Sequence, residues 1–352
     1  MPGPHTSAGR APHAPGRRRR RFRRASRPRT ECLLRPAAPV SPRGTRGDSS
    51  GQGNPDPMTD SGVVIVDKPA DWTSHDVVAR TRRLAGTRKV GHAGTLDPMA
   101  TGVLVLGIGK GTKLLGHLTL TEKAYTATLR LGLTTNTDDA EGEAGTRTDA
   151  SAVADEAVLA GAAALTGTIS QVPPQFSAIK VDGRRAYKSA RSGEEVELAS
   201  REVTVSEFAV EDVRRVDGPD GAFVDVDARV TCSSGTYIRA LARDLGAALG
   251  VGGHLTALRR TRVGPYDISQ ARTLEQLAEE FTAVPLAQAV ASAFPVRVLD
   301  SDEVRRIAHG NRISPGEQGP GPVGLFAQDG TVVALAEDRP GYAKPIVVFE
   351  AA

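Results

Sequence analysis

The chain has 352 residues, of which 39% are hydrophobic and 24% charged, as in an ordinary soluble globular protein. This length exceeds one small domain and predicts two domains with appendages. No run approaches the roughly 20 consecutive apolar residues of a membrane-spanning helix, and only two cysteines occur. We therefore expect a cytoplasmic protein without a membrane segment or a disulfide framework. No Cys/His cluster has zinc spacing, so no metal site is predicted.

The formal net charge of +4 hides an uneven distribution. Residues 1–57 contain 13 of the 45 Lys and Arg residues and three of the 41 Asp and Glu residues. The remaining chain therefore has 32 basic and 38 acidic residues, a net charge of −6. If this body binds a polyanion, it must do so through a local basic surface.

Residues 1–57 are rich in Arg, Pro, Gly and Ser, and we expect them to be disordered because they cannot bury a core. They could form a basic arm that holds RNA loosely through counterion release. We favour the simpler interpretation that this extension is not a natural part of the protein. Met58 precedes the first patterned segment, and translation could begin there.

The first patterned segments follow Met58. Residues 63–66 form a β-branched run, which predicts a strand. Ser74 is a candidate N-cap of a helix that ends at Gly86. Residues 103–106 predict a second short, apolar strand.

Two longer strands are predicted at 125–131 and 224–232, where apolar and polar residues alternate. A helix from about 237 to 249 follows the second of them and ends at Gly250. Long half-polar strands mixed irregularly with helices indicate an α+β fold whose sheet has one wetted face. They do not indicate a doubly wound parallel core.

Near Phe294 a helical stretch at 274–281 gives way to short strand-like pieces separated by Gly/Pro-rich turns, at 323–326, 332–335 and 346–349. We therefore place a small β-rich C-terminal domain at 294–352.

The densest chemical signal is the segment from Gly91 to Gly102, which combines glycines, a histidine, an aspartate and a proline. Pro98 disfavours helical backbone at Asp97, and the glycines permit close backbone approach. The strand expected at 103–106 follows directly, which would place the carboxylate at the rigid edge of a sheet. From these residues alone, an Asx-type turn in which Asp97 only caps backbone N–H groups is as plausible as a catalytic carboxylate.

The same segment resembles the catalytic motif of the TruB-type tRNA pseudouridine synthases. Further motifs recur in the family's order between about residues 62 and 265. They are Asp67-Lys68-Pro69 with the following Ser74-containing helix, Lys123-Ala124-Tyr125, Ser234-Gly235-Thr236-Tyr237-Ile238-Arg239, and Gly253-His254 followed by Leu258-Arg259-Arg260.

The resemblance implies a pseudouridine synthase fold, with a central mixed, mainly antiparallel sheet flanked by helices. It implies a catalytic domain at 58–290 and an insertion at about 138–200 that helps to grip the T arm of tRNA. It also implies a PUA-like RNA-binding domain at 294–352, although no single residue can be carried over there.

The resemblance also implies roles for three catalytic candidates. Asp97 matches the essential aspartate, and Arg239 matches the arginine that pairs with it and would keep it ionised. Tyr125 matches the tyrosine that stacks on the flipped base and is implicated in proton removal. From the sequence pattern alone, Tyr125 would be a core aromatic residue and Arg239 a solvated charge.

The implied substrate-binding residues are His92, Tyr237, Leu258, Lys68 and Lys113. His92 matches a histidine that fills space vacated by bases extruded from the T loop, and Leu258 an apolar contact on the pocket wall. Tyr237 lies beside the paired arginine. His92 could instead only form a hydrogen bond within its loop, and a lone lysine is usually solvated.

The implied activity is isomerisation of uridine to pseudouridine at position 55 of tRNA, by base flipping. The reaction has no redox change and no net hydrolysis, so no cofactor is expected. The implied partner is the tRNA T stem-loop, bound by a monomer without a guide RNA. The alternatives are a guide-RNA-dependent synthase acting on rRNA and a non-catalytic RNA-binding protein on the same scaffold. The segment 107–113 suggests a phosphate loop, but its glycine and lysine spacing fails the Walker pattern.

Overall fold

The computed structural model describes residues 61–176, 180–181, 184–185, 198–218 and 221–349. The expectations for residues 1–57 lie outside these residues, and those for the insertion at 138–200 lie partly outside them. None of the helices in the described residues is long and apolar enough to cross a membrane.

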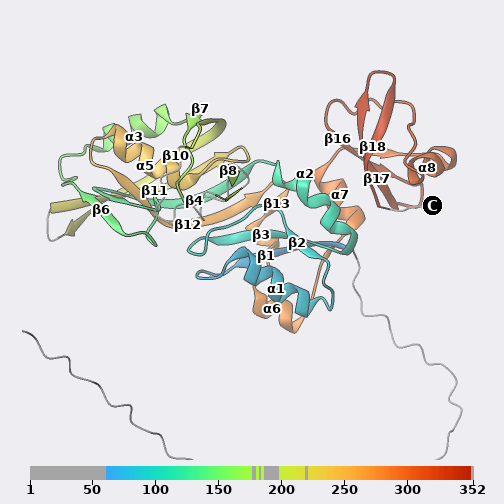
Figure 1. Ribbon diagram of the computed structural model, residues 1–352, viewed down its shortest axis with the longest axis horizontal. Helices are drawn as coiled ribbons and strands as arrows, with labels where there is room; N and C mark the ends of the chain where they lie inside the picture. The colour runs from blue at the N-terminus through green and yellow to red at the C-terminus, as the bar shows by residue number, and fades with distance from the viewer. Residues whose placement is uncertain (1–60, 177–179, 182–183, 186–197, 219–220, 350–352) are drawn as a thin grey trace, which may run out of the picture. The chain divides into compact units, whose positions relative to one another are not determined.

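The described residues build a ten-stranded sheet in the order β14-β1-β3-β12-β4-β11-β10-β7, with β2 added beside β3 and β13 beside β12 (Figure 1). β3 and β12 run parallel, and the other pairs in this sheet are antiparallel. The expected mixed, mainly antiparallel sheet is confirmed. The strands are β1 Gly62–Lys68, β2 Val90–His92, β3 Thr101–Ile108, β4 Lys123–Leu131, β7 Gly167–Gln171, β10 Arg201–Gly218, β11 Gly221–Cys232, β12 Gly253–Val263, β13 Tyr266–Asp267 and β14 Val284–Pro285.

Different helices pack on the two halves of this sheet, one of which contains β1 and β3 and the other β4 and β11 (Figure 1). They are α1 Ser74–Leu84, η1 Gly109–Leu114, α2 Leu115–Thr119, α3 Asp155–Ala164, α5 Ile238–Ala248, η2 Ile268–Gln270, α6 Leu274–Glu279 and α7 Leu286–Ala293. Two short hairpins, β5 Leu133–Thr135 with β6 Ala144–Arg147 and β8 Lys180–Val181 with β9 Arg184–Arg185, complete this part.

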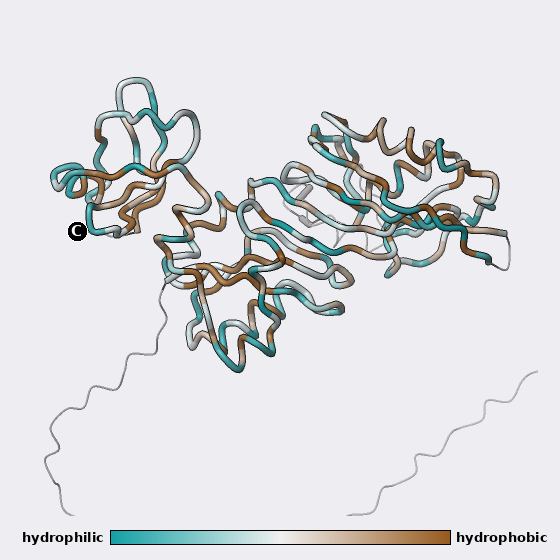
Figure 2. Tube along the Cα trace, turned by 180° about the vertical axis from the view of Figure 1, so that it is seen from behind, coloured by the Kyte–Doolittle hydropathy of each residue, from teal (hydrophilic) through white to brown (hydrophobic). Residues whose placement is uncertain are grey.

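β1 and β3 are buried on both faces, which explains their continuous apolar sequences. One face packs against α1 and α6, and the other against η1, α2 and α7. In Figure 2 the tube is brown along these central strands. In contrast, β4 and β11 bury only the face that packs against α3 and α5. Their other face carries polar side chains, as the alternating pattern predicts.

The start of α1 differs from its prediction. Thr73, not Ser74, is the N-cap: its hydroxyl accepts a hydrogen bond from the Asp76 N–H, and the Asp76 carboxylate accepts one from the Thr73 N–H. This reciprocal arrangement is a capping box. Ser74 is instead buried, with 1% exposure. Because it is not the cap, its hydroxyl is available for a contact with a distant loop.

The C-terminal part contains a four-stranded sheet in the order β15-β16-β17-β18 and the helix α8 Ser301–Ala308, which the sequence analysis missed. Its strands are Val296–Val298, Pro322–Phe326, Val332–Arg339 and Tyr342–Val348. Apolar residues of this sheet share a core with α7 and with β1 and β3.

Candidate active site

The loop that carries the candidate catalytic aspartate, residues 93–100, joins β2 to β3 and is fixed on both sides of the carboxylate. The buried Ser74 hydroxyl on α1 accepts from the Leu96 N–H at 2.9 Å and donates to the Leu96 carbonyl at 3.1 Å. Lys68 Nζ, at the end of β1, donates to the Pro98 carbonyl at 3.0 Å. The residue between these two anchors therefore has little freedom to move.

The expected position of Asp97 at the edge of the sheet is wrong. β3 lies inside the sheet, between β1 and β12, and the loop enters it at Thr101. Asp97 therefore lies four residues before a central strand, whose first residues pair with both β1 and β12.

Arg260 on β12 holds the first residues of the same loop in place. Its side chain is 1% exposed, and its Nε donates to the Val103 carbonyl at 2.7 Å. Its Nη2 and Nη1 donate to the carbonyls of Gly94 at 3.1 Å and Thr95 at 3.4 Å. Gly94 has a φ of +94°, a conformation that side chains disfavour, so this turn requires glycine. The sequence motif Leu258-Arg259-Arg260 contains Arg260 but does not indicate this role.

Arg239, in the first turn of α5, lies between two carboxylates. Its Nε is 3.0 Å from Oδ2 of Asp97, and its Nη1 is 3.2 Å from Oδ2 of Asp139. The guanidinium also donates to the carbonyls of Thr137, at 2.7 Å, and Phe176, at 3.0 Å. Within the described residues the Nε–H has no well-aligned acceptor, so its contact with Asp97 is an ion pair rather than a directed hydrogen bond.

Asp97 and Asp139 differ in their surroundings. The Asp139 side chain is 4% exposed and also accepts from the Thr137 hydroxyl and from the Glu141 N–H at 3.1 Å. The Asp97 side chain is 37% exposed. Asp139 is thus a fixed internal counterion of Arg239, whereas Asp97 retains an accessible oxygen.

Burial raises the pKa of Asp97 above its usual value. The positive charge of Arg239 opposes this rise, while the negative charge of Asp139 adds to it. Arg239 therefore favours the ionised form of Asp97, as expected. Desolvation has the larger effect on the pKa, however, and it favours the protonated form. The exposure of the carboxylate toward the pocket moderates this desolvation.

A cavity of about 310 Å³ opens beside Asp97 and brings together five of the predicted site residues. Asp97, Arg239, Tyr125, Tyr237 and Leu258 all line it. Tyr125 and Leu258 are 8% and 9% exposed and provide apolar walls. Burial raises the pKa of the Tyr125 hydroxyl, so this group is protonated at neutral pH.

Three predicted residues lie outside the cavity lining. Lys68 donates to the backbone carbonyls of Pro69 and Pro98 and so holds the loop next to Asp97. His92 packs edge-to-face against His75, with ring centroids 5.6 Å apart, and its buried Nδ1 has no hydrogen-bond partner among the described residues. Lys113 donates from Nζ to the Val348 carbonyl of β18 at 2.6 Å.

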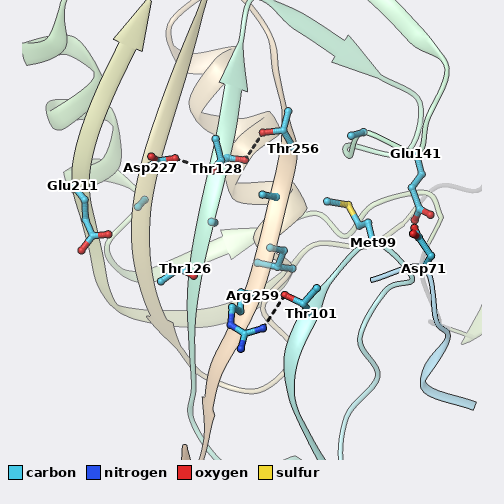
Figure 3. A pocket seen from close by; sticks show the side chains of 15 residues that line it. Asp71, Met99, Thr101, Thr126, Thr128, Glu141, Glu211, Asp227, Thr256 and Arg259 are labelled. Atoms are coloured by element: carbon cyan, nitrogen blue, oxygen red, sulfur yellow. Dashed lines mark hydrogen bonds between the residues drawn. The ribbon is translucent and has the colours of Figure 1, made fainter. Parts of the chain in front are cut away.

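A larger cavity of about 520 Å³ lies on the polar face of the sheet (Figure 3). Thr126, Thr128 and Asp227 line it from neighbouring strands, and Asp71 and Glu141 line it from loops. It contains neither the Asp97 carboxylate nor Arg239. We therefore place the candidate active site in the smaller cavity. The described residues contain no cluster of His, Cys, Asp or Glu suited to a metal ion.

The two lysines near the loop should make stability depend on pH. Burial lowers the pKa of Lys68 to about 8 and that of Lys123 to about 8. In the unfolded chain both keep a pKa near 10.4, so above about pH 8 the unfolded state binds more protons than the folded state. We expect the free energy of unfolding to rise between about pH 8 and 9, with a slope of up to about 1.4 kcal/mol per pH unit for each lysine.

Denaturant titrations across this interval would measure the slope. Lys123→Met should remove its share, because a neutral side chain does not titrate. Above about pH 9 the Cys232 thiol, whose pKa burial raises to about 11, should offset the trend. A stability that falls steadily from pH 8 to 9 would contradict the expected titration of the two lysines.

Three family models match the chain in sequence: the TruB family pseudouridylate synthase N-terminal domain at residues 82–238, the tRNA pseudouridylate synthase B C-terminal domain at 239–290, and the tRNA pseudouridine synthase II C-terminal domain at 294–350. Among curated relatives, tRNA pseudouridine synthase B of Thermobifida fusca is 72% identical over 288 residues, which cover 82% of this chain and 98% of the relative. The enzyme of the same name from Streptomyces griseus is 58% identical over 292 residues, covering 83% and 98%.

Two solved complexes contain a chain with a similar fold. A Cbf5-Nop10-Gar1 complex contains a chain that is 26% identical, with a TM-score of 0.63 and coverage of 86% of this chain and 93% of that one. An H/ACA RNP bound to a substrate RNA containing 2'-deoxyuridine gives 25% identity and a TM-score of 0.60, with coverage of 82% and 84%. The three consecutive family models and the high identity to the bacterial relatives agree on one assignment: the chain belongs to the TruB family of pseudouridylate synthases.

Proposed function

We propose that this chain isomerises uridine to pseudouridine at position 55, in the T loop of tRNA, with Asp97 as the essential carboxylate. The observation that carries the proposal is the cavity where Asp97, Arg239, Tyr125 and Leu258 meet in a chain of this family. The relatives named tRNA pseudouridine synthase B, at 57–72% identity, support tRNA as the substrate.

The first requirement of the reaction is access to a base that is normally stacked. Extruding a base costs a few kcal/mol, and an aromatic pocket recovers part of that cost. The proposed pocket offers the Tyr125 ring and the Leu258 side chain as apolar walls for the flipped uracil. A cavity of about 310 Å³ has room for a flipped uracil.

The second requirement is cleavage of the bond between C1′ of ribose and N1 of uracil, followed by joining of C1′ to C5. A carboxylate can act as the nucleophile or stabilise positive charge on the sugar. Asp97 suits either role because one face is open to the pocket while Arg239 holds it at 3.0 Å. The proton at C5 must then leave, and Tyr125 lies in the pocket as a candidate to assist once it is deprotonated or linked through water.

The reaction leaves the oxidation state of both partners unchanged, so we propose that it proceeds without a cofactor. We further propose that the insertion at about 138–200 and the C-terminal part at 294–352 hold the body of the tRNA. For His92, which is half-buried, we propose contact with the RNA on the basis of the family motif that contains it.

A guide-RNA-dependent mode is the second candidate, favoured by the likeness to the H/ACA RNP and to the archaeal box H/ACA sRNP Nop10-Cbf5 complex, at 25% and 26% identity. The bacterial relatives are more than twice as similar, and the match covers 98% of each relative and 82–83% of this chain. We therefore propose that recognition requires only the folded T stem-loop, read through its shape and backbone.

The test is to incubate the purified full-length protein with unmodified tRNA and, separately, with an isolated T stem-loop. We expect mass spectrometry after nuclease digestion to find one pseudouridine in each RNA, at position 55, without added nucleotide or guide RNA. A T stem-loop with uridine 55 replaced by cytidine serves as the control. Modification only in the presence of a guide RNA would contradict the proposal.

A further inference from the structure

The cations that line the active-site cavity are already engaged by protein groups. Lys123 Nζ donates to the carbonyls of Thr119 and Thr121, each at 2.8 Å. Arg260 is held by three backbone carbonyls, and Arg239 by two carboxylates and two carbonyls, as described above. These side chains fix the site, and they have little remaining capacity to hold the backbone of a substrate.

Arg201, at the first position of β10, is different. Its guanidinium lies over the Tyr237 ring, with its central carbon 5.7 Å from the ring centroid. It is half-buried, and within the described residues it forms no ion pair and no side-chain hydrogen bond. A Cβ added to Gly235, which lines the cavity, would lie 3.9 Å from Nη1 of Arg201, so the guanidinium lies next to the part of the cavity wall that Gly235 forms.

The position of Arg201 is fixed by its neighbours. It pairs across β7 and β10 with Gln171, which is fully buried. The Gln171 amide clamps the main chain of Tyr237: Oε1 accepts from its N–H at 2.8 Å, and Nε2 donates to its carbonyl at 3.2 Å. One strand pair therefore holds both the Tyr237 backbone and the arginine above its ring.

We propose that Arg201 binds a backbone phosphate of the RNA next to the flipped uridine. A guanidinium has five donors in a planar fork that matches phosphate oxygens, and here those donors are free within the described residues. A base inserted into the cavity leaves its own phosphates outside, and Arg201 lies beside two residues of the cavity wall, Gly235 and Tyr237. The net charge of −6 on residues 58–352 makes such a local cation necessary for holding a polyanion. This proposal rests on the proposed function, because it requires an RNA substrate.

The experiment measures the affinity of full-length wild type, Arg201→Met and Arg201→Lys for unmodified tRNA at several salt concentrations between about 50 and 200 mM. Methionine retains length and apolar contact with Tyr237 but removes the charge. Arg215→Met is the matched control, because Arg215 lies at the far end of β10, where it pairs with Asp155. Thermal melting confirms that each variant folds.

For Arg201→Met we expect about tenfold weaker binding, the size of one hydrogen bond to a charged group. The slope of log affinity against log salt concentration should fall by about 0.7 to 0.9, the value for one phosphate contact. Arg201→Lys should retain the slope but lose part of the affinity, and Arg215→Met should resemble wild type.

An unchanged salt slope in a folded Arg201→Met variant would overturn the proposal and leave Arg201 as a packing partner of Tyr237. An equal change in Arg215→Met would also overturn it, because the effect would then reflect total charge. If wild type binds tRNA but forms no pseudouridine, the proposed function fails while the slope comparison still decides the role of Arg201.

Discussion

Replacing Asp97 with asparagine is expected to abolish pseudouridine formation while the protein still folds and binds tRNA. Asparagine has nearly the same shape and can keep the turn, but a neutral amide cannot act as a carboxylate nucleophile or stabilise positive charge on the sugar. Single-turnover tritium release from tRNA labelled at C5 of uridine measures the effect. We expect less than about 1% of the wild-type rate, a loss of more than ~2.7 kcal/mol of transition-state stabilisation.

The same substitution should not destabilise the fold at neutral pH. The pKa of Asp97 is raised in the folded state, chiefly by burial, so the folded protein favours the protonated form more than the unfolded chain does. The favourable contribution of this group is present at pH values below its unfolded pKa and is lost as pH rises through its folded pKa. At pH 7 a neutral asparagine therefore removes a cost.

We expect Asp97→Asn to melt at or above the wild-type temperature at pH 7, and the difference to shrink as the pH falls toward 4. Asp244→Asn is the matched control, because Asp244 on α5 is a carboxylate of similar exposure that pairs with Arg243 and does not line the cavity. Near-wild-type turnover in Asp97→Asn would instead support the interpretation of Asp97 as a turn-forming residue.

The strands were the most predictable part of the fold, because the pattern of apolar and polar residues along each strand reflects which of its faces are buried. The run at 63–66 belongs to a strand covered on both faces, and the alternating segment at 125–131 belongs to one covered on a single face. Both patterns follow directly from the period-two geometry of a strand. The helix α8 was missed because its buried contacts are few: only Ile307 is fully buried.

The candidate site was predictable only where a motif marked it. Asp97, Tyr125 and Arg239 stand out through family motifs, but the roles of Asp139 and Arg260 depend on partners 100 and 157 residues away in sequence. Asp138 and Asp139 look alike in the sequence. Only the tertiary structure shows that Asp139 faces Arg239, whereas Asp138, with a φ of +60°, turns toward Arg243.

The second large effect, a loss of stability, is expected when the ion pair between Arg239 and Asp139 is broken. Both side chains are almost fully buried, at 6% and 4% exposure. Replacing Arg239 with methionine leaves the Asp139 carboxylate without its cation and leaves two carbonyls without a donor. Removing one partner of a buried ion pair typically costs about 3–5 kcal/mol, so we expect a loss of that order in the free energy of unfolding.

Adding Asp139→Asn to Arg239→Met should restore part of that stability, because the deeply buried Asp139 charge is removed while the more exposed Asp97 carboxylate remains without its cation. Catalysis should not return, since Asp97 still lacks the positive charge that lies 3.0 Å away in the wild type. We expect both variants to turn over at least about 100-fold more slowly than wild type, in the range for loss of one electrostatic partner in an active site.

Denaturant unfolding of wild type, both single variants and the double variant gives the coupling energy between the two residues. Tritium release on the same four proteins separates folding from chemistry. A coupling energy near zero would show that Asp139 is not the counterion of Arg239. Recovery of activity together with stability in the double variant would show that Arg239 serves only to neutralise Asp139, and that Asp97 acts without it.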